Sequence, residues 1–369
     1  MFLWHTFGVM VSHRLIAGSA GILLCGLSAW SGVMLVAQNK QTVPDGGVPT
    51  LHVYANTIQI PVLVLGADRE RIAKPIPASR FWVNFNDGPW FHATHVRLEE
   101  DDPISLSIVL DATGGAGLMP KIDDAIANLA PLSLHAKDHV SIYALDCELT
   151  RAANDVPADH LQLKDEVDRA LESWTNRSMD KHAAPCRNPV HLWDAMAFIS
   201  QQLYKLPGRR VILAVTDGND KGSVNSWNGL RLYDQQAGIA VFGVVPIPRD
   251  FGSAYLERWS RENPFQALCE LSGGIVVMTK ENKLEQTLNR FMTMVRGRYI
   301  VEFPRPANSS AGEYGMAVKI DKSNDLFIRA AGISFPVPDA AVRADPTTVP
   351  SDPSRAPEIG KRRVLTTPN

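Results

Sequence analysis

Apolar strand-like runs alternate with segments of helical period from Ile104 to Val295, and this alternation constrains the fold more than any other feature. The runs that predict strands cover residues 105–110, 140–145, 211–215, 239–245 and 275–278. The segments that predict helices cover residues 122–129, 161–174, 190–206, 227–237, 268–271 and 284–295. Near-continuous apolar runs are typical of strands buried on both faces by helices. The sequence therefore predicts a doubly wound α/β fold with a mostly parallel sheet.

Shorter runs of β type flank this α/β region, residues 104–297, on both sides. Residues 50–103 contain apolar or alternating runs, such as 57–64 and 81–85, that are separated by turn signals. A second segment, residues 298–335, holds three further strand candidates at 299–303, 316–320 and 326–330. We therefore expect a small β-rich flanking unit beside the α/β domain.

The two ends of the chain differ from the rest in composition. Residues 1–37 contain an uncharged stretch from Leu15 to Ala37, which predicts either a signal peptide or an N-terminal membrane anchor. Both readings stay open because about 20 apolar residues also suffice to span a bilayer. Residues 38–49 are polar with Pro and Gly and are expected to be a linker. Residues 336–369 carry many prolines and few apolar residues, so we expect a disordered tail.

Charge and motif content weigh against several function classes. The 37 Lys plus Arg nearly balance the 39 Asp plus Glu, so no whole-chain field attracts nucleic acid. The sequence lacks Gly-x-Ser-x-Gly, His-Glu-x-x-His, Gly-x-Gly-x-x-Gly and Walker-type Gly-Lys-Ser/Thr motifs. We therefore expect a binding protein with a protein partner, and not an enzyme.

Two aspartate-containing loops follow strands of the predicted sheet. Asp111-Ala112-Thr113-Gly114-Gly115 follows the first strand, and Thr216-Asp217-Gly218 follows the third. In open α/β sheets, ligands bind beyond the carboxyl ends of the strands. Further along lie Asn188-Pro189-Val190-His191-Leu192-Trp193-Asp194-Ala195 and Leu271-Ser272-Gly273-Gly274. In this order, the four segments resemble those of the von Willebrand factor A (vWA) domain.

The resemblance covers about residues 50–335. The β segments on either side, including Arg298-Tyr299-Ile300-Val301, are similar to those of the VWFA-related proteins of the acidobacterial type. The resemblance implies a domain for adhesion or protein recognition. It also implies a metal-ion-dependent adhesion site, in which an Asp-x-Ser-x-Ser motif, a distant Thr and a Thr-Asp-Gly aspartate surround a divalent ion.

The residues at these positions predict a degenerate metal site. Asp111, Thr113 and Asp217 retain oxygen ligands, whereas Gly115 and Val190 stand where the family has hydroxyl residues. Mg²⁺ demands near-octahedral oxygen coordination, so Mg²⁺ or Mn²⁺ would bind weakly at such a site. The alternative is a structural role, in which Asp111 caps the following helix and Asp217 organises its turn.

The same edge is the predicted surface for partner recognition, centred on Asp111, Thr113 and Asp217 with His191 and Asp220 beside them. Aspartates that arrive from separate strands repel each other. A cation, an arginine or lysine of the partner, or water could compensate that repulsion. Two alternatives to adhesion stay open. One is a scaffold component of a cell-envelope assembly without metal, and the other is a hydrolase whose aspartates hold a metal.

Three cysteines follow the N-terminal segment. Cys147 comes just after a predicted strand and Cys186 just before a predicted helix, so both are expected at the carboxyl edge of the sheet. Cys269 lies in an apolar helix stripe and is expected in the core. We therefore predict a Cys147–Cys186 disulfide, which requires an oxidising compartment. Together with the apolar N-terminal segment, it predicts an exported protein, either secreted, periplasmic or anchored to the membrane.

Overall fold

The structure is a computed structural model that describes residues 53–54, 57–72, 74–100, 102–180, 182–184, 186, 190–220, 222–247, 259, 263–305, 312–323, 325–335 and 349–350. The predicted signal peptide or anchor, the linker and most of the predicted tail lie outside the described residues. None of the helices in the described ranges is both long enough and apolar enough to cross a membrane.

The central sheet has six strands in the order β11-β10-β9-β6-β7-β8, and all neighbours pair in parallel except β7 and β8. The strands are β6 (Ile104–Asp111), β7 (His139–Leu145), β8 (Leu149–Pro157), β9 (Arg209–Val215), β10 (Ile239–Pro246) and β11 (Val276–Thr279). Every residue of β6 is buried, as the apolar run predicts for a central strand.

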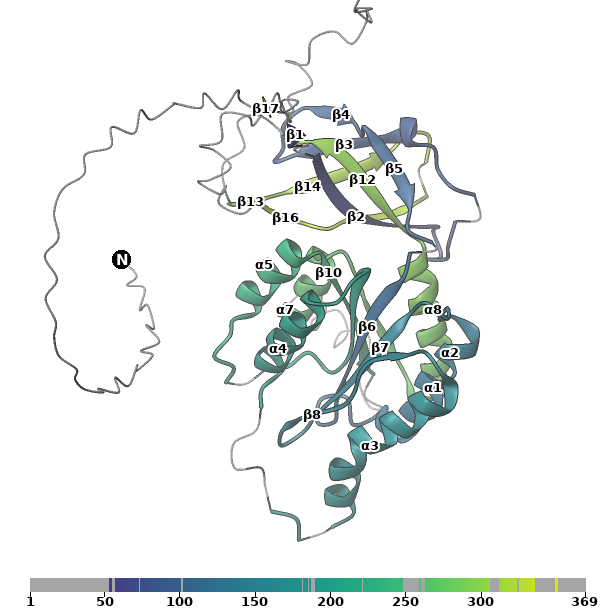
Figure 1. Cartoon of the computed structure of the whole chain (residues 1–369), viewed down its shortest axis with the longest axis vertical. Coiled ribbons are helices and arrows are strands. Elements are labelled where there is room, and N and C mark those ends of the chain that lie inside the picture. The colour runs from purple at the N-terminus through teal and green to yellow at the C-terminus, as the bar shows by residue number, and fades with distance from the viewer. Residues whose placement is uncertain are drawn as a thin grey trace, which may run out of the picture. The chain divides into compact units, whose positions relative to one another are not determined.

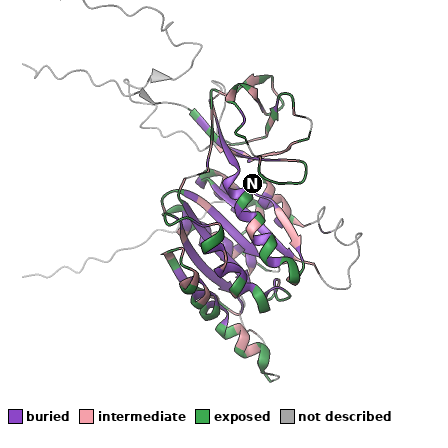
Figure 2. Ribbon diagram, turned by 90° about the vertical axis from the view of Figure 1, so that its right-hand side faces the viewer, coloured by how far each residue is buried: buried purple, intermediate pink, exposed green. Residues whose placement is uncertain are grey.

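Helices cover both faces of this sheet (Figure 1). One layer contains α1 (Ile122–Ala127), α2 (Leu129–Leu132), α3 (His160–Met179) and α8 (Leu284–Arg296), and the other contains α4 (Leu192–Tyr204), α5 (Trp227–Ala237) and α7 (Pro264–Leu271). The 3₁₀ helices within the described ranges are η1 (Ala78–Arg80), η2 (Met119–Lys121) and η3 (Glu281–Lys283). Figure 2 shows the strands buried between helices whose outer faces are exposed. The predicted doubly wound α/β fold is confirmed.

Several element bounds differ from the predicted ones; helix α7, for example, begins at Pro264 and not at Leu268. Strand β8, an antiparallel edge strand in which only Ala153 is buried, was not predicted from the sequence. Helix α3 runs one turn beyond the predicted end at Trp174, and its last turn is largely exposed. Helix α4 begins at Leu192 and not at Val190, because His191 has the extended backbone of an N-cap residue.

The two flanking β segments are strands of shared sheets. Strand β2 (Thr57–Leu65) pairs with β12 (Arg298–Pro304), which lies more than 200 residues further along the chain. The larger sheet has the order β15-β2-β12-β5, and the smaller sheets are β14-β3-β4 and β13-β16. The remaining bounds are β3 (Phe81–Phe85), β4 (Trp90–His92), β5 (His95–Leu98), β13 (Gly312–Tyr314), β14 (Met316–Ile320), β15 (Phe327–Ala330) and β16 (Ile333–Phe335). These strands share a separate apolar core.

Two residues of the proline-rich tail also pair in a sheet. Strand β17 (Val349–Pro350) lies parallel to β1 (Val53–Tyr54). The other residues of that tail are outside the described ranges.

Buried ion pairs join the β unit to the amino end of the central sheet. Glu99, just after β5, accepts from Arg209 at 3.2 Å and from Arg298 at 2.9 Å. Nearby, Arg296 at the end of α8 pairs with the fully buried Asp138, which also accepts from the backbone N–H of Ile104. Burial, opposed in part by Glu99, lowers the pKa of the Arg209 guanidinium. These charges fix the start of β6, β9 and β12 to one another.

Candidate functional site

The residues singled out in the sequence line one pocket at the carboxyl end of the central sheet. The pocket has a volume of about 330 Å³ and lies between the loops after β6, β7 and β9 and the start of α4. Its lining residues are Asp111, Thr113, Gly114, Leu145, Asp146, Cys186, Val190, His191, Leu192, Asp217, Asn219 and Asp220. The topology of the sheet thus gathers these side chains at one edge.

Asp111 ends β6 and organises the loop that follows it. Its Oδ1 accepts from the backbone N–H of Thr113 at 3.1 Å, the Thr113 hydroxyl at 2.8 Å and the backbone N–H of Gly114 at 2.9 Å. Its Oδ2 accepts from the Thr216 hydroxyl at 2.6 Å, which ties the first aspartate loop to the second. Asp111 is 3% exposed, so these donors compensate for the water it has lost.

Asp217 lies close to Asp111 across Gly114. A β-carbon on Gly114 would lie 2.4 Å from Asp111 Oδ2 and 2.6 Å from Asp217 Oδ1, so only glycine fits between the two carboxylates. Both oxygens of Asp217 accept from Asn219, from its backbone N–H at 2.9 Å and from its side-chain amide at 2.8 Å. Asp217 therefore organises its own turn, while its carboxylate still lines the pocket.

Residues far along the chain hold the Asp217 loop in place. The backbone carbonyl of Asp217 accepts from Trp259 Nε1 at 3.0 Å and from Asn263 Nδ2 at 3.2 Å. Asn263 also caps α7 by accepting from the backbone N–H of Phe265. Gly218 has φ +73°, a left-handed conformation that favours glycine, and packs against Phe265.

A further hydrogen-bond network forms the wall of the pocket beside α4. Asp220 Oδ1 accepts from the Ser223 hydroxyl at 2.6 Å and from the backbone N–H of Trp193 at 3.3 Å. Asp194 accepts from the backbone N–H groups of Val224 and Asn225. Burial raises the pKa of Asp194, but these N–H donors outweigh it and the net pKa is lowered.

His191 is held by packing and lines the same pocket as the aspartates. A β-carbon on Gly222 would lie 2.9 Å from His191 Nε2, so the imidazole lies directly against the glycine backbone. The side chain does not cap α4, because it accepts no hydrogen bond from the first turn of that helix.

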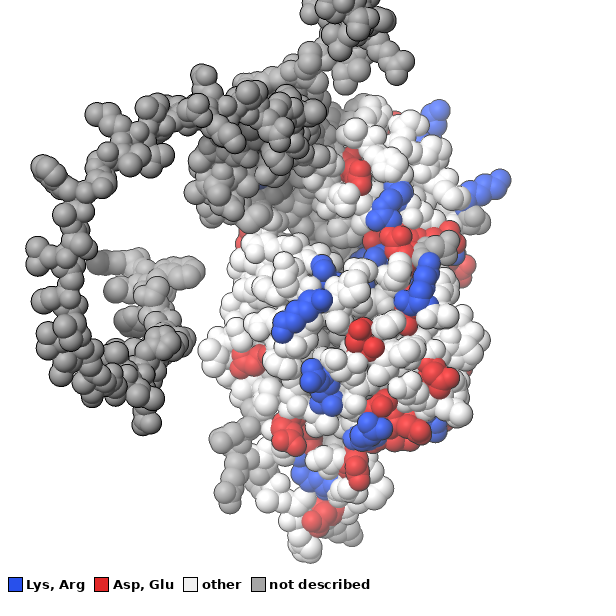
Figure 3. All heavy atoms as spheres, in the orientation of Figure 1, with Lys and Arg blue, Asp and Glu red and all other residues white. Residues whose placement is uncertain are grey.

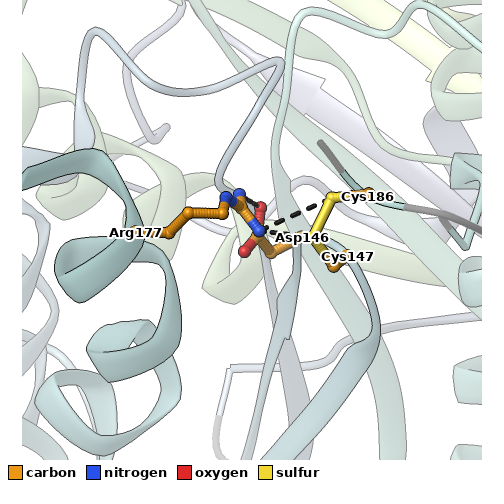
Figure 4. The surroundings of a disulfide bond; sticks show 4 residues. All are labelled: Asp146, Cys147, Arg177 and Cys186. Carbon is orange, nitrogen blue, oxygen red and sulfur yellow. Dashed lines mark hydrogen bonds and ion pairs between the residues drawn. A yellow bond between two sulfur atoms is a disulfide. The ribbon is translucent and has the colours of Figure 1, made fainter. Parts of the chain in front are cut away.

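A disulfide and an ion pair border the pocket on the β7 side (Figure 4). The sulfurs of Cys147 and Cys186 are bonded, with their Cα atoms 5.1 Å apart, and Cys269 is a free, buried thiol. Arg177 of α3 pairs with Asp146 and also contacts both sulfurs. The covalent bond thereby holds the chain before α4 against the end of β7.

The residues present do not fit a divalent ion held mainly by protein ligands. A β-carbon on Gly115 would lie 2.7 Å from the Asp111 carbonyl oxygen and 2.9 Å from that of Val215. These are backbone atoms, so a serine cannot occupy this position without moving the loop. Val190 offers no side-chain oxygen. Asp111, Thr113 and Asp217 remain, so an ion here would keep much of its water.

Asp146 and Asn219 belong to the pocket lining but were missed from the sequence. Asp146 directly follows the predicted strand that ends at Leu145, so its position at the carboxyl edge was the available signal. Asn219 lies in the loop Thr216-Asp217-Gly218-Asn219-Asp220 after the third predicted strand, so the same signal applied to it, but its two hydrogen bonds to Asp217 could not be predicted.

The α/β unit has the fold that the resemblance to the vWA domain implies. Its six-stranded sheet has one antiparallel edge strand, and the Asp-x-Thr and Thr-Asp-Gly loops lie at adjacent strand ends beside the start of α4.

Searches for related proteins find similarity at the level of structure. No protein-family model matches the sequence, and no curated protein matches it either. A crystal structure of BatB from Bacteroides thetaiotaomicron is 15% identical, with a TM-score of 0.35, and the match covers 52% of this chain and 99% of that one. Manganese-loaded TRAP from Plasmodium vivax is 12% identical, with a TM-score of 0.34, over 64% and 95% of the two chains. Proximal thread matrix protein 1 of the mussel byssus, with a zinc-occupied metal-ion-dependent adhesion site, is 9% identical, with a TM-score of 0.36, over 54% and 50%.

Proposed function

We propose that this chain is an exported protein-binding module that recognises a protein partner at the pocket formed by Asp111, Thr113, Asp217, His191 and Asp220. The observation that carries the proposal is the pocket itself, which gathers these side chains at the carboxyl end of a mostly parallel sheet. Mg²⁺ or Mn²⁺ binds there weakly and is not required for recognition.

Binding is a better account of this pocket than catalysis. The Thr113 hydroxyl donates to Asp111, which resembles a nucleophile beside a base. However, Asp111 Oδ1 also accepts from two backbone N–H groups, so the oxygen that would take the proton is already occupied by its own loop. Asp111 therefore acts as a turn-organising acceptor in this proposal.

Export is proposed on two grounds. The chain carries an uncharged apolar stretch near its start, and the Cys147–Cys186 bond persists only in an oxidising compartment. A fusion of residues 1–50 to a reporter that is active only outside the cytoplasm tests this. We expect an active reporter, and a reporter retained in the cytoplasm would contradict export.

Partner capture by the full chain tests the role of the pocket. We expect Asp217→Ala and Thr113→Ala variants to fold and to lose the protein that the wild type captures from envelope extract. A Glu172→Ala variant, which removes an exposed carboxylate of α3, is the control and is expected to capture normally. Unchanged capture by both pocket variants would move the interface away from this edge, and the β unit would be the next surface to examine.

A further inference from the structure

The charged residues that line the pocket are all acidic. Four aspartates line it, and the described lining includes no lysine or arginine. By contrast, the face of the molecule drawn in Figure 3 intersperses basic and acidic side chains. Within the described ranges, Asp111, Asp217 and Asp220 accept hydrogen bonds from uncharged donors and form no ion pair. Three negative charges in one pocket favour a positively charged ligand.

A buried carboxylate oxygen without a partner adds a second, independent observation. Asp146 is 8% exposed, and its Oδ1 pairs with Arg177. Its Oδ2 is buried and has no hydrogen-bond partner among the described residues. A buried acceptor without a donor costs free energy, and Asp146 lines the same pocket as the other three aspartates.

From these observations we infer that the pocket takes the side-chain ammonium group of a lysine of the partner. The inference rests on the proposed function and names the chemistry by which the partner is recognised. The apolar wall formed by Leu145, Val190 and Leu192 fits such a ligand, because the four-carbon stem of lysine packs on apolar surface while its charged end reaches polar groups.

A divalent ion fits the pocket less well than an ammonium group. Direct coordination of Mg²⁺ needs lone pairs in near-octahedral directions. Asp111 Oδ1 already accepts three hydrogen bonds, and Gly115 leaves no room for a further hydroxyl ligand. An ammonium group is a compact charge with three rotatable donors, so it tolerates oxygens that approach from different loops.

A guanidinium group also fits less well. Its planar fork pairs best with a carboxylate whose two oxygens are both free. Both oxygens of Asp111 are occupied by Thr113, Gly114 and Thr216, and both oxygens of Asp217 are occupied by Asn219. Asp111 has no acceptor site left, whereas Asp217 keeps capacity for further donors, which suits single hydrogen bonds to an ammonium group.

Calorimetric titration of the full chain in non-ionic detergent tests this inference. The probes are Nα-acetyl-lysine amide, Nα-acetyl-arginine amide, and Nα-acetyl-glutamate amide with Mg²⁺. We expect the lysine probe to bind most tightly, and we expect Asp217→Asn and Asp220→Asn each to weaken it about tenfold, as for loss of one charged hydrogen bond. Glu172→Gln is the matched control and should leave its binding unchanged.

Competition with partner capture provides a test on the unmodified protein. An excess of the lysine probe should release the captured partner from the wild-type chain, and the arginine probe should release less. Tighter binding of the Mg²⁺–glutamate pair, or no binding of the lysine probe, would overturn the inference. If Asp217→Ala abolishes capture while the lysine probe does not bind, the proposed function stands and only the lysine assignment falls. If capture survives both Asp217→Ala and Thr113→Ala, the proposed function itself fails.

Discussion

The acidic residues at the two ends of the central sheet have different kinds of partners. At the amino end, Glu99 and Asp138 are buried and each pairs with at least one arginine. At the carboxyl end, Asp111 and Asp217 accept only from neutral hydroxyl, amide and backbone N–H groups among the described residues. Paired charges at the first end join the β unit to the sheet. At the second end Asp146 pairs with Arg177, but Asp111 and Asp217 meet no arginine or lysine among the described residues.

Acidic residues at the two ends of one sheet thus differ in role because their partners differ. A buried ion pair holds two elements in one geometry. Removing one partner leaves the other charge buried and unpaired, which is strongly destabilising. A carboxylate held by neutral donors keeps its negative charge uncancelled. The amino end should therefore govern stability, and the carboxyl end should govern binding.

Removing Glu99 is expected to have the largest effect on stability. Glu99→Ala leaves Arg209 and Arg298 buried without their carboxylate, which should lower the free energy of unfolding by about 3–5 kcal/mol. Glu100→Ala is the control, because Glu100 pairs with Arg71 at the surface and should cost less than about 1 kcal/mol. Urea denaturation measures both. Equal effects for the two variants would contradict the structural role of the amino end.

Removing the disulfide should come next. Cys147 and Cys186 are 39 residues apart, and in the chain-entropy model a crosslink of this span contributes about 3–4 kcal/mol. The double serine variant should lose that much, whereas Cys269→Ala removes a buried thiol but no crosslink and should lose less. Non-reducing peptide mapping checks the bond directly. Recovery of both peptides unlinked would refute it.

The sequence predicted the layers of the fold better than it predicted the connections between its parts. The strands at 105–110 and 211–215 were recognisable because buried parallel strands are continuously apolar. Strand β8 was not recognisable, because an edge strand is half exposed and carries no such run. The pairing of β2 with β12 joins segments at opposite ends of the domain, so no local pattern could reveal it.

The site was predictable as a set of residues but not as a geometry. Asp111, Thr113, Asp217, His191 and Asp220 could be placed at one edge because they follow strands or begin a helix. The Asp111 and Val215 carbonyl oxygens leave no room for a side chain at Gly115. This restriction depends on how the loop packs and cannot be predicted from the sequence.

A buried aspartate of α5 shows the effect of burial without hydrogen-bond donors. Asp234 of α5 is fully buried, its carboxylate oxygens have no hydrogen-bond partner within the described ranges, and burial raises its pKa to about 8. In the unfolded chain the Asp234 carboxyl group loses its proton near pH 4, whereas in the folded protein it keeps the proton up to about pH 8. The contribution of this group should therefore lower the free energy of unfolding by about 1.4 kcal/mol per pH unit as the pH rises from 4 to 8. Above about pH 8 the contribution should no longer change.

Replacing Asp234 with asparagine should remove that contribution. The difference in the free energy of unfolding between Asp234→Asn and the wild type should shift in favour of the variant as the pH rises from 4 to 8. Denaturation at several pH values measures it. A difference that does not change with pH would mean that Asp234 is charged in the folded state.

The smallest effect on stability is expected from a substitution at Gly115, where the vWA family has a hydroxyl residue. Gly115→Ser should destabilise the protein by about 1–3 kcal/mol, as for overpacking, and should not create a tight Mg²⁺ site. Gly117→Ser is the matched control in the same loop, because the nearest atom to its β-carbon, Pro246 Cβ, lies 4.0 Å away. Thermal unfolding and Mg²⁺ calorimetry measure the two effects. Tight metal binding by Gly115→Ser without loss of stability would show that the loop accommodates the serine side chain, contrary to this prediction.

The response of partner capture to a chelator tests the central claim most directly, namely that the carboxyl end binds a partner without needing a metal ion. Capture by the full chain would be compared with Mg²⁺, with Mn²⁺ and with an excess of chelator. We predict equal capture by the wild type in all three conditions and none by Asp217→Ala in any of them. Capture that requires the ion and disappears with the chelator would contradict the account.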